Sequence, residues 1–237
     1  MAAPNASAQT SSTIDHFFAP PDDPSRTKTH LLVACTGSIA TIKLPNILTY
    51  LSRFSSTLSV HVILTPAAIN FLPPSLRNPS PQVSIPSVYP IVSRCWTDAD
   101  EWVQWRAIGD PVLHIELRKW ADLLLIAPLS ADFLAKIVGG HVDGLLGGVV
   151  RAWDVNKRIV VAPAMNTHMW MHPLTEEHMS VLRERWKDWV TVLEPVEKRL
   201  ACGDVGTGAM REWSEVVDYV ASYLRLQEDV EQKNVDV

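Results

Sequence analysis

The sequence PVLHIELRKWADLLLIAPLSADFLAKIVGG, residues 111–140, decides the fold class of this chain. Residues 115–120 have a helical pattern, residues 123–127 are entirely apolar, and residues 128–132 form a turn that opens a second helix. An apolar strand without alternation that runs into a helix is typical of a parallel sheet buried on both faces. Ligands of such sheets bind at the carboxyl ends of the strands, so we expect Ser130 and Asp132 to lie at a binding edge.

Similar strand and helix units lie on both sides of this stretch. The pattern predicts strands at residues 30–35, 58–64, 158–162 and 189–193, and helices at residues 39–53, 142–153, 173–187 and 212–226. Pro45 predicts a kink in the first of these helices. Gly144, Gly147 and Gly148 predict that another backbone or a subunit comes close to the helix at 142–153. The alternation predicts a single α/β domain over residues 29–226, with a central parallel sheet flanked by helices.

Other segments do not follow this alternation. Residues 1–28 have the composition of a disordered tail, and the acidic residues 227–237 are expected to be solvated. Residues 73–95 form a proline-rich excursion in which we expect neither strand nor helix. Just beyond it, the spacing of Trp96, Trp102 and Trp105 favours packing over a wall for a bound ring. Residues 195–211 hold several glycines around Cys202, which predicts a flexible flap.

Composition limits the function classes. A net charge of -5 gives no support for nucleic-acid binding. The three cysteines are far apart, which predicts neither a disulfide framework nor a metal knuckle and fits a reducing compartment. No apolar run approaches the roughly 20 residues of a membrane helix, and the first residues lack the apolar core of a signal peptide. We therefore expect a cytoplasmic protein without a membrane partner.

Candidate binding residues follow the predicted strands. The turn Gly37-Ser38-Ile39 comes after the first strand and Thr65 after the second, which is where a phosphate or flavin cradle would lie. The turn alone is a weak signal, because no full GxGxxG pattern is present. Asn166 follows another strand, where it could simply cap the next turn.

Histidine and cysteine residues are ambiguous when each is taken alone. His114 by itself fits a structural histidine better than a catalyst, and Cys202 fits either an inert or a reactive thiol. His168 and His172 have a metal-binding spacing, but no HExxH pattern or third ligand accompanies them, so we expect no metal site. A serine hydrolase of the GxSxG type is excluded, because that motif is missing.

Five short sequence motifs, or blocks, taken together, indicate a family more clearly than any single residue does. HIELRKWAD begins at residue 114, APLSAD at 127, AWD at 152, PAMN at 163, and ACGD with GTGAM spans 201–210. In this order they resemble the homo-oligomeric flavin-containing cysteine decarboxylases over roughly residues 29–220. The resemblance implies a flavodoxin-like (Rossmann-type) sheet that binds FMN, and a homotrimer whose active sites lie between subunits.

The resemblance also implies roles for individual residues. His114 matches the family's catalytic histidine, Asn166 its substrate-binding asparagine, and Cys202 the cysteine of its substrate flap, with a role as proton donor. The FMN contacts map onto Gly37, Ser38, Ile39, Thr65, Ser130, Ala131, Asp132, Phe133 and Ala164.

One pair of these residues departs from the family pattern. Relatives usually carry Asn-Thr where this chain has Asp132-Phe133. A carboxylate beside a flavin phosphate would repel it, so we expect Asp132 to cap its helix or to point away.

Within the family, the blocks are most similar to the branch that decarboxylates phosphopantothenoylcysteine in coenzyme A biosynthesis. An alternative is the role of the fungal halotolerance proteins, which act as inhibitory subunits of a protein phosphatase or as one part of a mixed trimer. Such relatives often lack the histidine or the cysteine function and have long acidic tails, so the enzyme is favoured here. Decarboxylation of a peptide's C-terminal cysteine fits the HIELRKW and ACGD blocks less well.

Overall fold

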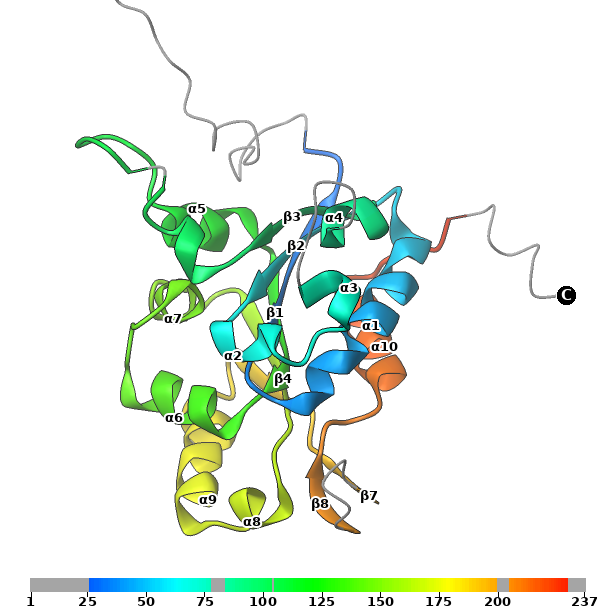
Figure 1. Ribbon diagram of the computed structural model, residues 1–237, viewed down its shortest axis with the longest axis vertical. Coiled ribbons are helices and arrows are strands. Elements are labelled where there is room, and N and C mark those ends of the chain that lie inside the picture. Colours follow the sequence, from blue (N-terminus) through cyan, green and yellow to red (C-terminus); the bar gives the residue numbers. More distant parts are fainter. Residues whose placement is uncertain (1–25, 78–83, 104, 200–204, 230–237) are drawn as a thin grey trace, which may run out of the picture.

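The computed structural model describes residues 26–77, 84–103, 105–199 and 205–229. Its centre is a six-stranded parallel sheet with the order β3-β2-β1-β4-β5-β6, which confirms the predicted α/β class (Figure 1). The strands are β1 (Thr29–Cys35), β2 (Leu58–Leu64), β3 (Val92–Trp96), β4 (Leu123–Leu129), β5 (Arg158–Pro163) and β6 (Val190–Val192). The predicted disordered tail lies outside the described residues except for residues 26–28, as does most of the acidic end.

The central strands are apolar because both of their faces are buried. In β1, Leu31, Val33 and Cys35 point into one hydrophobic cluster, whereas Leu32 and Ala34 point into a second cluster on the opposite face. Strand β4 divides its side chains in the same way and is buried along its whole length. The lack of alternation in the sequence therefore reflects a sheet with two cores.

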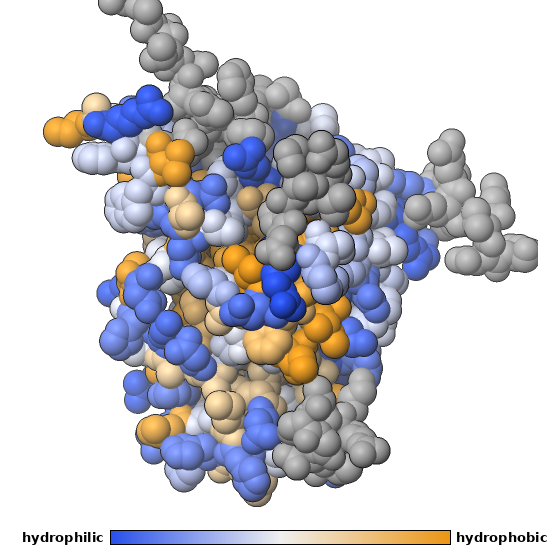
Figure 2. All heavy atoms as spheres, viewed as in Figure 1, coloured by the Kyte–Doolittle hydropathy of each residue, from blue (hydrophilic) through white to orange (hydrophobic). Residues whose placement is uncertain are grey.

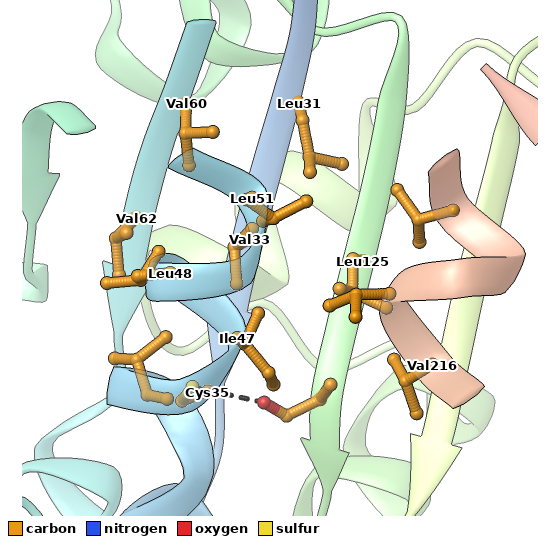
Figure 3. Close-up of a cluster of buried hydrophobic side chains, with 14 of the residues drawn as sticks. Leu31, Val33, Cys35, Ile47, Leu48, Leu51, Val60, Val62, Leu125 and Val216 are labelled. Atoms are coloured by element: carbon orange, nitrogen blue, oxygen red, sulfur yellow. Dashed lines mark hydrogen bonds between the residues drawn. The ribbon is translucent and has the colours of Figure 1, made fainter. Parts of the chain in front are cut away.

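Two layers of helices cover these faces (Figure 1). One layer consists of the 3₁₀ turn η1 (Ile39–Lys43), α1 (Leu44–Leu51), the 3₁₀ turn η2 (Ser52–Phe54) and α10 (Trp213–Tyr223). Figure 3 shows leucine, isoleucine and valine side chains of α1 and α10 meeting those of β1, β2 and β4. The opposite layer holds α5 (Leu113–Trp120), α6 (Ala131–Gly139), α7 (Leu145–Arg151), α9 (Pro173–Ser180) and the π-helical turn η4 (Val181–Arg185).

The proline-rich segment differs from its prediction. Its described residues form two short helices, α3 (Pro74–Arg77) and α4 (Ile85–Val88), and then the edge strand β3. Helix α4 begins with a capping box between Ser84 and Ser87, which stabilises a single turn despite the proline within it. Strand β3 buries Val92 and Trp96, exposes Ser93 and leaves the two residues between partly buried, a pattern that the surrounding prolines obscure.

Smaller differences concern tryptophans, glycines and the first helix. Packing is confirmed for Trp96 only, since Trp102 and Trp105 are exposed. The predicted close approach of backbone is confirmed at Gly147, where a Cβ would lie 3.3 Å from the carbonyl oxygen of His141, whereas Gly144 and Gly148 face side chains of Asp98 and His114. The predicted helix at 39–53 is split, with 3₁₀ turns on both sides of α1 and Pro45 in the first turn of α1.

The remaining elements lie near the strand ends. They are α2 (Pro66–Ile69), the 3₁₀ turn η3 (Asp98–Asp100), α8 (Thr167–Trp170), and an antiparallel hairpin of β7 (Val196–Arg199) and β8 (Val205–Ala209). Within the described ranges, no helix has the length and apolar character needed to cross a membrane.

Candidate functional site

Three helical elements begin at the carboxyl edge of the sheet, each capped by a predicted site residue. Ser38 Oγ accepts from the amide of Ala40 at the start of η1, at 3.5 Å. Thr65 Oγ1 accepts from the amide of Ala68 in α2 at 3.3 Å, and Ser130 Oγ accepts from the amide of Phe133 at 3.2 Å. Three helical N-termini therefore converge on one edge, where their partial positive charges favour an anionic group.

A residue that the sequence analysis did not select joins these turns. Thr36 Oγ1 donates to the carbonyl of Pro128 at 2.8 Å and accepts from the amide of Ser130 at 2.7 Å. Its own carbonyl accepts from the hydroxyl of Thr41 at 3.1 Å. Thr36 thereby fixes the end of β1 to the end of β4. This contact holds the N-termini of η1 and α6, which follow these strands, next to one another.

A cavity of about 630 Å³ opens beside these turns. Its wall combines η1, the start of α6, the segment after β5, strand β8 and the residues before α10. Predicted cofactor contacts in this wall are Gly37, Ser38, Ile39, Ser130, Ala131, Asp132 and Ala164, and Asn166 is there too. A second cavity of about 290 Å³ adjoins it and is lined by Thr65 and Phe133, so all nine predicted contacts lie along one of the two cavities.

The lining residues fit a flat apolar ligand that carries an anionic group. Gly37 comes so close to α2 that a Cβ at this position would lie 2.7 Å from the Cβ of Ala67. The apolar side chains of Ile39 and Ile42 line the large cavity and are each 48% exposed. Apolar residues gather at the centre of the face seen in Figure 2, around the places of α1 and α2 in Figure 1. Exposed apolar groups beside helix N-termini are what a flavin ring and its phosphate require.

Asp132 does not cap α6, because Ser130 does so, and its carboxylate points away from the cap. The side chain is 72% exposed and forms an ion pair with Lys136 at 3.2 Å. Lys136 also pairs with Asp143 at 3.1 Å, and its hydrogen bonds to these two carboxylates raise the pKa of its ammonium group. Lys136 therefore offsets the charge of Asp132; because Asp132 lines both cavities, its orientation relative to a bound phosphate stays a prediction.

Asn166 lies at the start of α8 on the wall of the large cavity. Its Oδ1 accepts from the amide of His168 at 2.8 Å. Next to it, the amide of Met165 donates to the carbonyl of Gly208 at 2.9 Å, so strand β8 is joined to this segment. Gly208 has a φ of +117°, a conformation that favours glycine.

A model of the family described as Flavoprotein matches residues 21–225. The chain belongs to the flavoprotein family. It is 45% identical over 200 residues to a probable phosphopantothenoylcysteine decarboxylase of Arabidopsis thaliana, across 84% of this chain and 90% of the relative.

Two solved structures are similar over almost their whole length. One is a PPC decarboxylase variant, with a serine in place of a cysteine, in complex with pantothenoylaminoethenethiol. It has 43% identity and a TM-score of 0.71, and the match covers 84% of this chain and 99% of that one. The other is the FMN-binding protein AtHal3, with 44% identity and a TM-score of 0.69, over 85% of this chain and all of that one.

In this flavoprotein, His114 lies apart from the residues described so far. It is the second residue of α5 and lines neither of the two cavities at the strand ends. Its Nδ1 lies 2.5 Å from Oε1 of Glu101, a buried carboxylate that the sequence analysis did not select. A single chain therefore brings Asn166 and the cofactor contacts together but leaves His114 outside.

Cys202, His168 and His172 are the remaining residues that the sequence analysis weighed for chemical roles. Cys202 lies outside the described residues, so its role stays a prediction. The two histidines at metal-binding spacing, His168 and His172, belong to no cluster of three or more possible metal ligands among the described residues. Ring nitrogen Nδ1 of His172 instead accepts from the amide of Leu174 at the start of α9.

Proposed function

We propose that this flavoprotein is an FMN-dependent phosphopantothenoylcysteine decarboxylase, which forms phosphopantetheine and carbon dioxide in coenzyme A biosynthesis. The observation that carries the proposal is the large cavity, whose wall combines most of the predicted FMN contacts with Asn166. The similarity to a probable decarboxylase of this substrate and to a decarboxylase structure with a bound ethenethiol supports the same reaction.

The substrate needs an electron sink, because loss of carbon dioxide from a cysteinyl carboxylate would leave an unstabilised carbanion. The chemistry that FMN supplies when bound is a two-electron oxidation of the thiol-bearing carbon, and its reversal after decarboxylation. The residues Gly37, Ser38 and Ile39, with the turn at 130–133, Thr65 and Ala164, would hold the cofactor.

The chain's own residues orient the substrate and move protons. The side-chain amide of Asn166 holds the substrate carboxylate without adding a positive charge that would stabilise the ground state. His114 accepts the proton of the substrate thiol as a general base. Cys202 donates a proton when the decarboxylated enethiol is reduced, while a closed flap keeps water away.

We further propose that the active protein is a homotrimer in which His114 reaches the cavity of a neighbouring subunit. Support comes from the separation of His114 from both cavities within one chain. The test mixes two inactive variants, His114→Gln and Asn166→Asp, by coexpression. Mixed assemblies regain activity if the two residues come from different subunits, and stay inactive if each site is built by one chain.

The first experiment is an absorbance spectrum of the purified protein, followed by incubation with phosphopantothenoylcysteine. We expect a yellow protein that releases FMN on denaturation and forms carbon dioxide and phosphopantetheine. A yellow protein that leaves the substrate unchanged would favour the alternative, a regulatory subunit that inhibits a protein phosphatase or one part of a mixed trimer. A colourless protein that does not take up added FMN would contradict the cofactor assignment.

The role of Cys202 is tested by Cys202→Ser. Because the serine hydroxyl is a much poorer proton donor than a thiol, we expect the variant to release carbon dioxide but to stop at the oxidised ethenethiol. Mass spectrometry distinguishes this product from phosphopantetheine by two hydrogen atoms. Normal phosphopantetheine formation would reject the role.

A cytoplasmic location is part of the proposal. The free thiols of Cys35 and Cys95 support it, since unpaired cysteines fit a reducing compartment. Fractionation of cells that express the tagged chain tests the location, and recovery with an organelle would contradict it.

A further inference from the structure

Three acidic residues follow strand β3, and each has a different task. Asp98 Oδ1 accepts from the amide of Leu145 at 2.9 Å, so it binds the N-terminus of α7. Asp100 Oδ2 accepts from the amide and the hydroxyl of Thr97, which closes the turn η3. Glu101 is turned inward to His114, and 7% of the residue is exposed.

The carboxylate of Glu101 has an unusual environment for a structural residue. One oxygen, Oε1, contacts His114 Nδ1 at 2.5 Å, whereas the other, Oε2, is buried and has no hydrogen-bond partner among the described residues. Burial of a carboxylate with one oxygen unpartnered destabilises a fold. A group of this kind is retained where its contact with the neighbouring residue serves a function.

The ring of His114 is held from a second direction by α7. A Cβ at Gly148 would lie 3.0 Å from Cγ of His114, so the ring lies in close contact with this helix and a larger residue there would force it to shift. Because an ionised carboxylate can only accept, the contact with Glu101 places the imidazole proton on Nδ1. In the neutral form of the ring, the other nitrogen, Nε2, is then the one with a free lone pair, and a quarter of the His114 side chain is exposed.

We propose that Glu101 is a positioning residue for His114, which fixes the ring orientation and the tautomer in which Nε2 accepts the substrate's thiol proton. When that proton reaches Nε2, the ring becomes an imidazolium ion and the carboxylate of Glu101 offsets its charge. The reaction step rests on the proposed function, whereas the tautomer can be measured without substrate. A buried aspartate acts on the histidine of serine proteases by the same physical principle.

The test compares Glu101→Gln and Glu101→Leu in the FMN-loaded protein. The amide oxygen of Gln still accepts from Nδ1–H but carries no charge, whereas Leu removes the acceptor. The matched control is Glu116→Gln, a carboxylate on the same helix as His114 that pairs with Lys119 at 2.9 Å instead. The readouts are kcat, KM, and ¹⁵N NMR spectra of protein with labelled histidine, in which His114→Gln identifies the His114 signals.

In the wild type at about pH 8, where an ordinary imidazole is neutral, we expect Nδ1 of His114 to be protonated and Nε2 to be unprotonated. Glu101→Leu should shift the tautomer toward Nε2–H and lower kcat roughly a hundredfold, with little change in KM. Glu101→Gln should keep the wild-type tautomer and an intermediate kcat, and the control should resemble the wild type.

The proposal is overturned if wild-type His114 carries its proton on Nε2, or if Glu101→Leu keeps both the tautomer and kcat. It is also overturned if Glu101→Gln loses the tautomer, because the amide oxygen is then no substitute for the carboxylate. Should Glu101→Leu fail to fold, the wild-type and Glu101→Gln spectra still decide the question. If the wild type does not decarboxylate the substrate, the proposed function fails, while the tautomer result stands separately.

Discussion

The two edges of the central sheet use their polar groups differently. At the amino edge, the carboxylate of Asp122 accepts from Arg26 at 2.5 Å and from the amide of His30 at 2.9 Å. Lys157 donates to the carbonyls of Lys119 and Ala121 at 3.0 and 2.7 Å. At the carboxyl edge, helical N-termini and the exposed side chain of Ile39 instead face the large cavity.

The difference separates stability from function within one sheet. At the amino edge, Asp122 and Lys157 find their partners inside the chain, so these contacts contribute to the free energy of unfolding. At the carboxyl edge the apolar surface and the helical N-termini are left for a ligand, at some expense of stability. Substitutions at the amino edge should therefore lower stability and leave activity unchanged. Substitutions at the carboxyl edge should lower activity and leave stability near wild type.

The largest effect is expected at the carboxyl edge, from Asn166→Asp. The new carboxylate still accepts from the amide of His168 and keeps the N-cap of α8, but it repels the carboxylate of the substrate. We expect kcat/KM to fall at least roughly a hundredfold, while the unfolding midpoint in urea and the FMN content stay near wild type. Steady-state assays and urea titrations measure both; a destabilised variant with normal kcat would place Asn166 among the structural residues.

The converse is expected at the amino edge, from Asp122→Asn. Loss of the charge weakens the contact with Arg26, whose side chain is 14% exposed against 33% for Asp122. After allowance for this exposure, we expect a loss of about 2 kcal/mol in the free energy of unfolding, with kcat unchanged.

A surface pair supplies the matched control for this substitution. Glu215→Gln removes the exposed ion pair with Arg211 at 2.9 Å and should change the unfolding free energy by less than about 0.5 kcal/mol. Equal effects of the two substitutions in urea titrations would contradict the assignment of stability to the amino edge.

Gly37→Ala should affect both properties, because this turn connects the sheet with the cavity. The added Cβ would meet that of Ala67 at 2.7 Å and push α2 away. We expect about 1 kcal/mol of destabilisation and a roughly tenfold weaker affinity for FMN, measured by fluorescence titration. Gly140→Ala is the control: its φ of +74° makes alanine unfavourable, but no atom lies near the added Cβ, so only stability should fall. An unchanged FMN affinity in Gly37→Ala would remove this glycine from the binding site.

Most of the carboxyl edge was predictable because its signals are local in sequence. The apolar run that becomes β4 and the cap at Ser130 occupy adjacent residues, so the pattern predicts both the strand and the helix that follows it. Strand β3 was missed because an edge strand with polar residues beside prolines lacks such a signal. Segment ends were predicted less well than segments, as at the split helix around α1.

Contacts between distant segments were not predictable in the same way. Thr36 joins β1 to β4 across more than ninety residues, and a threonine at a strand end gives no sign of its partner. Glu101 lies in an acidic run whose three carboxylates differ only in where the folded chain turns them. The separation of His114 from Asn166 also depends on how α5 and α8 are placed relative to one another. The spacing of residues in the sequence does not predict that placement.

The smallest effect is expected at His61, beside the buried end of α5, where the pH dependence of stability can be measured. The ring of Trp120 stacks on the rings of His61 and His30, with centroid distances of 4.0 and 4.4 Å. Burial lowers the pKa of His61 from its ordinary 6.5 to about 3, and the neighbouring His30 and Arg94 act in the same direction. His61 therefore stays neutral in the folded chain, and its Nδ1 accepts from the indole N–H of Trp96 at 3.2 Å.

The pH dependence of stability follows from this difference. Below pH 6.5 the unfolded chain takes up a proton at His61 that the folded chain does not bind, so stability is lost as the pH falls from 6.5 toward 3. Between about pH 7.5 and 5.5 the loss is on the order of 1 kcal/mol. His61→Gln keeps an acceptor for Trp96 but has no proton to bind, so its urea midpoint should depend less on pH than that of the wild type. Parallel pH profiles of the two proteins would contradict this, because they would mean that His61 binds its proton as readily in the folded chain as in the unfolded chain.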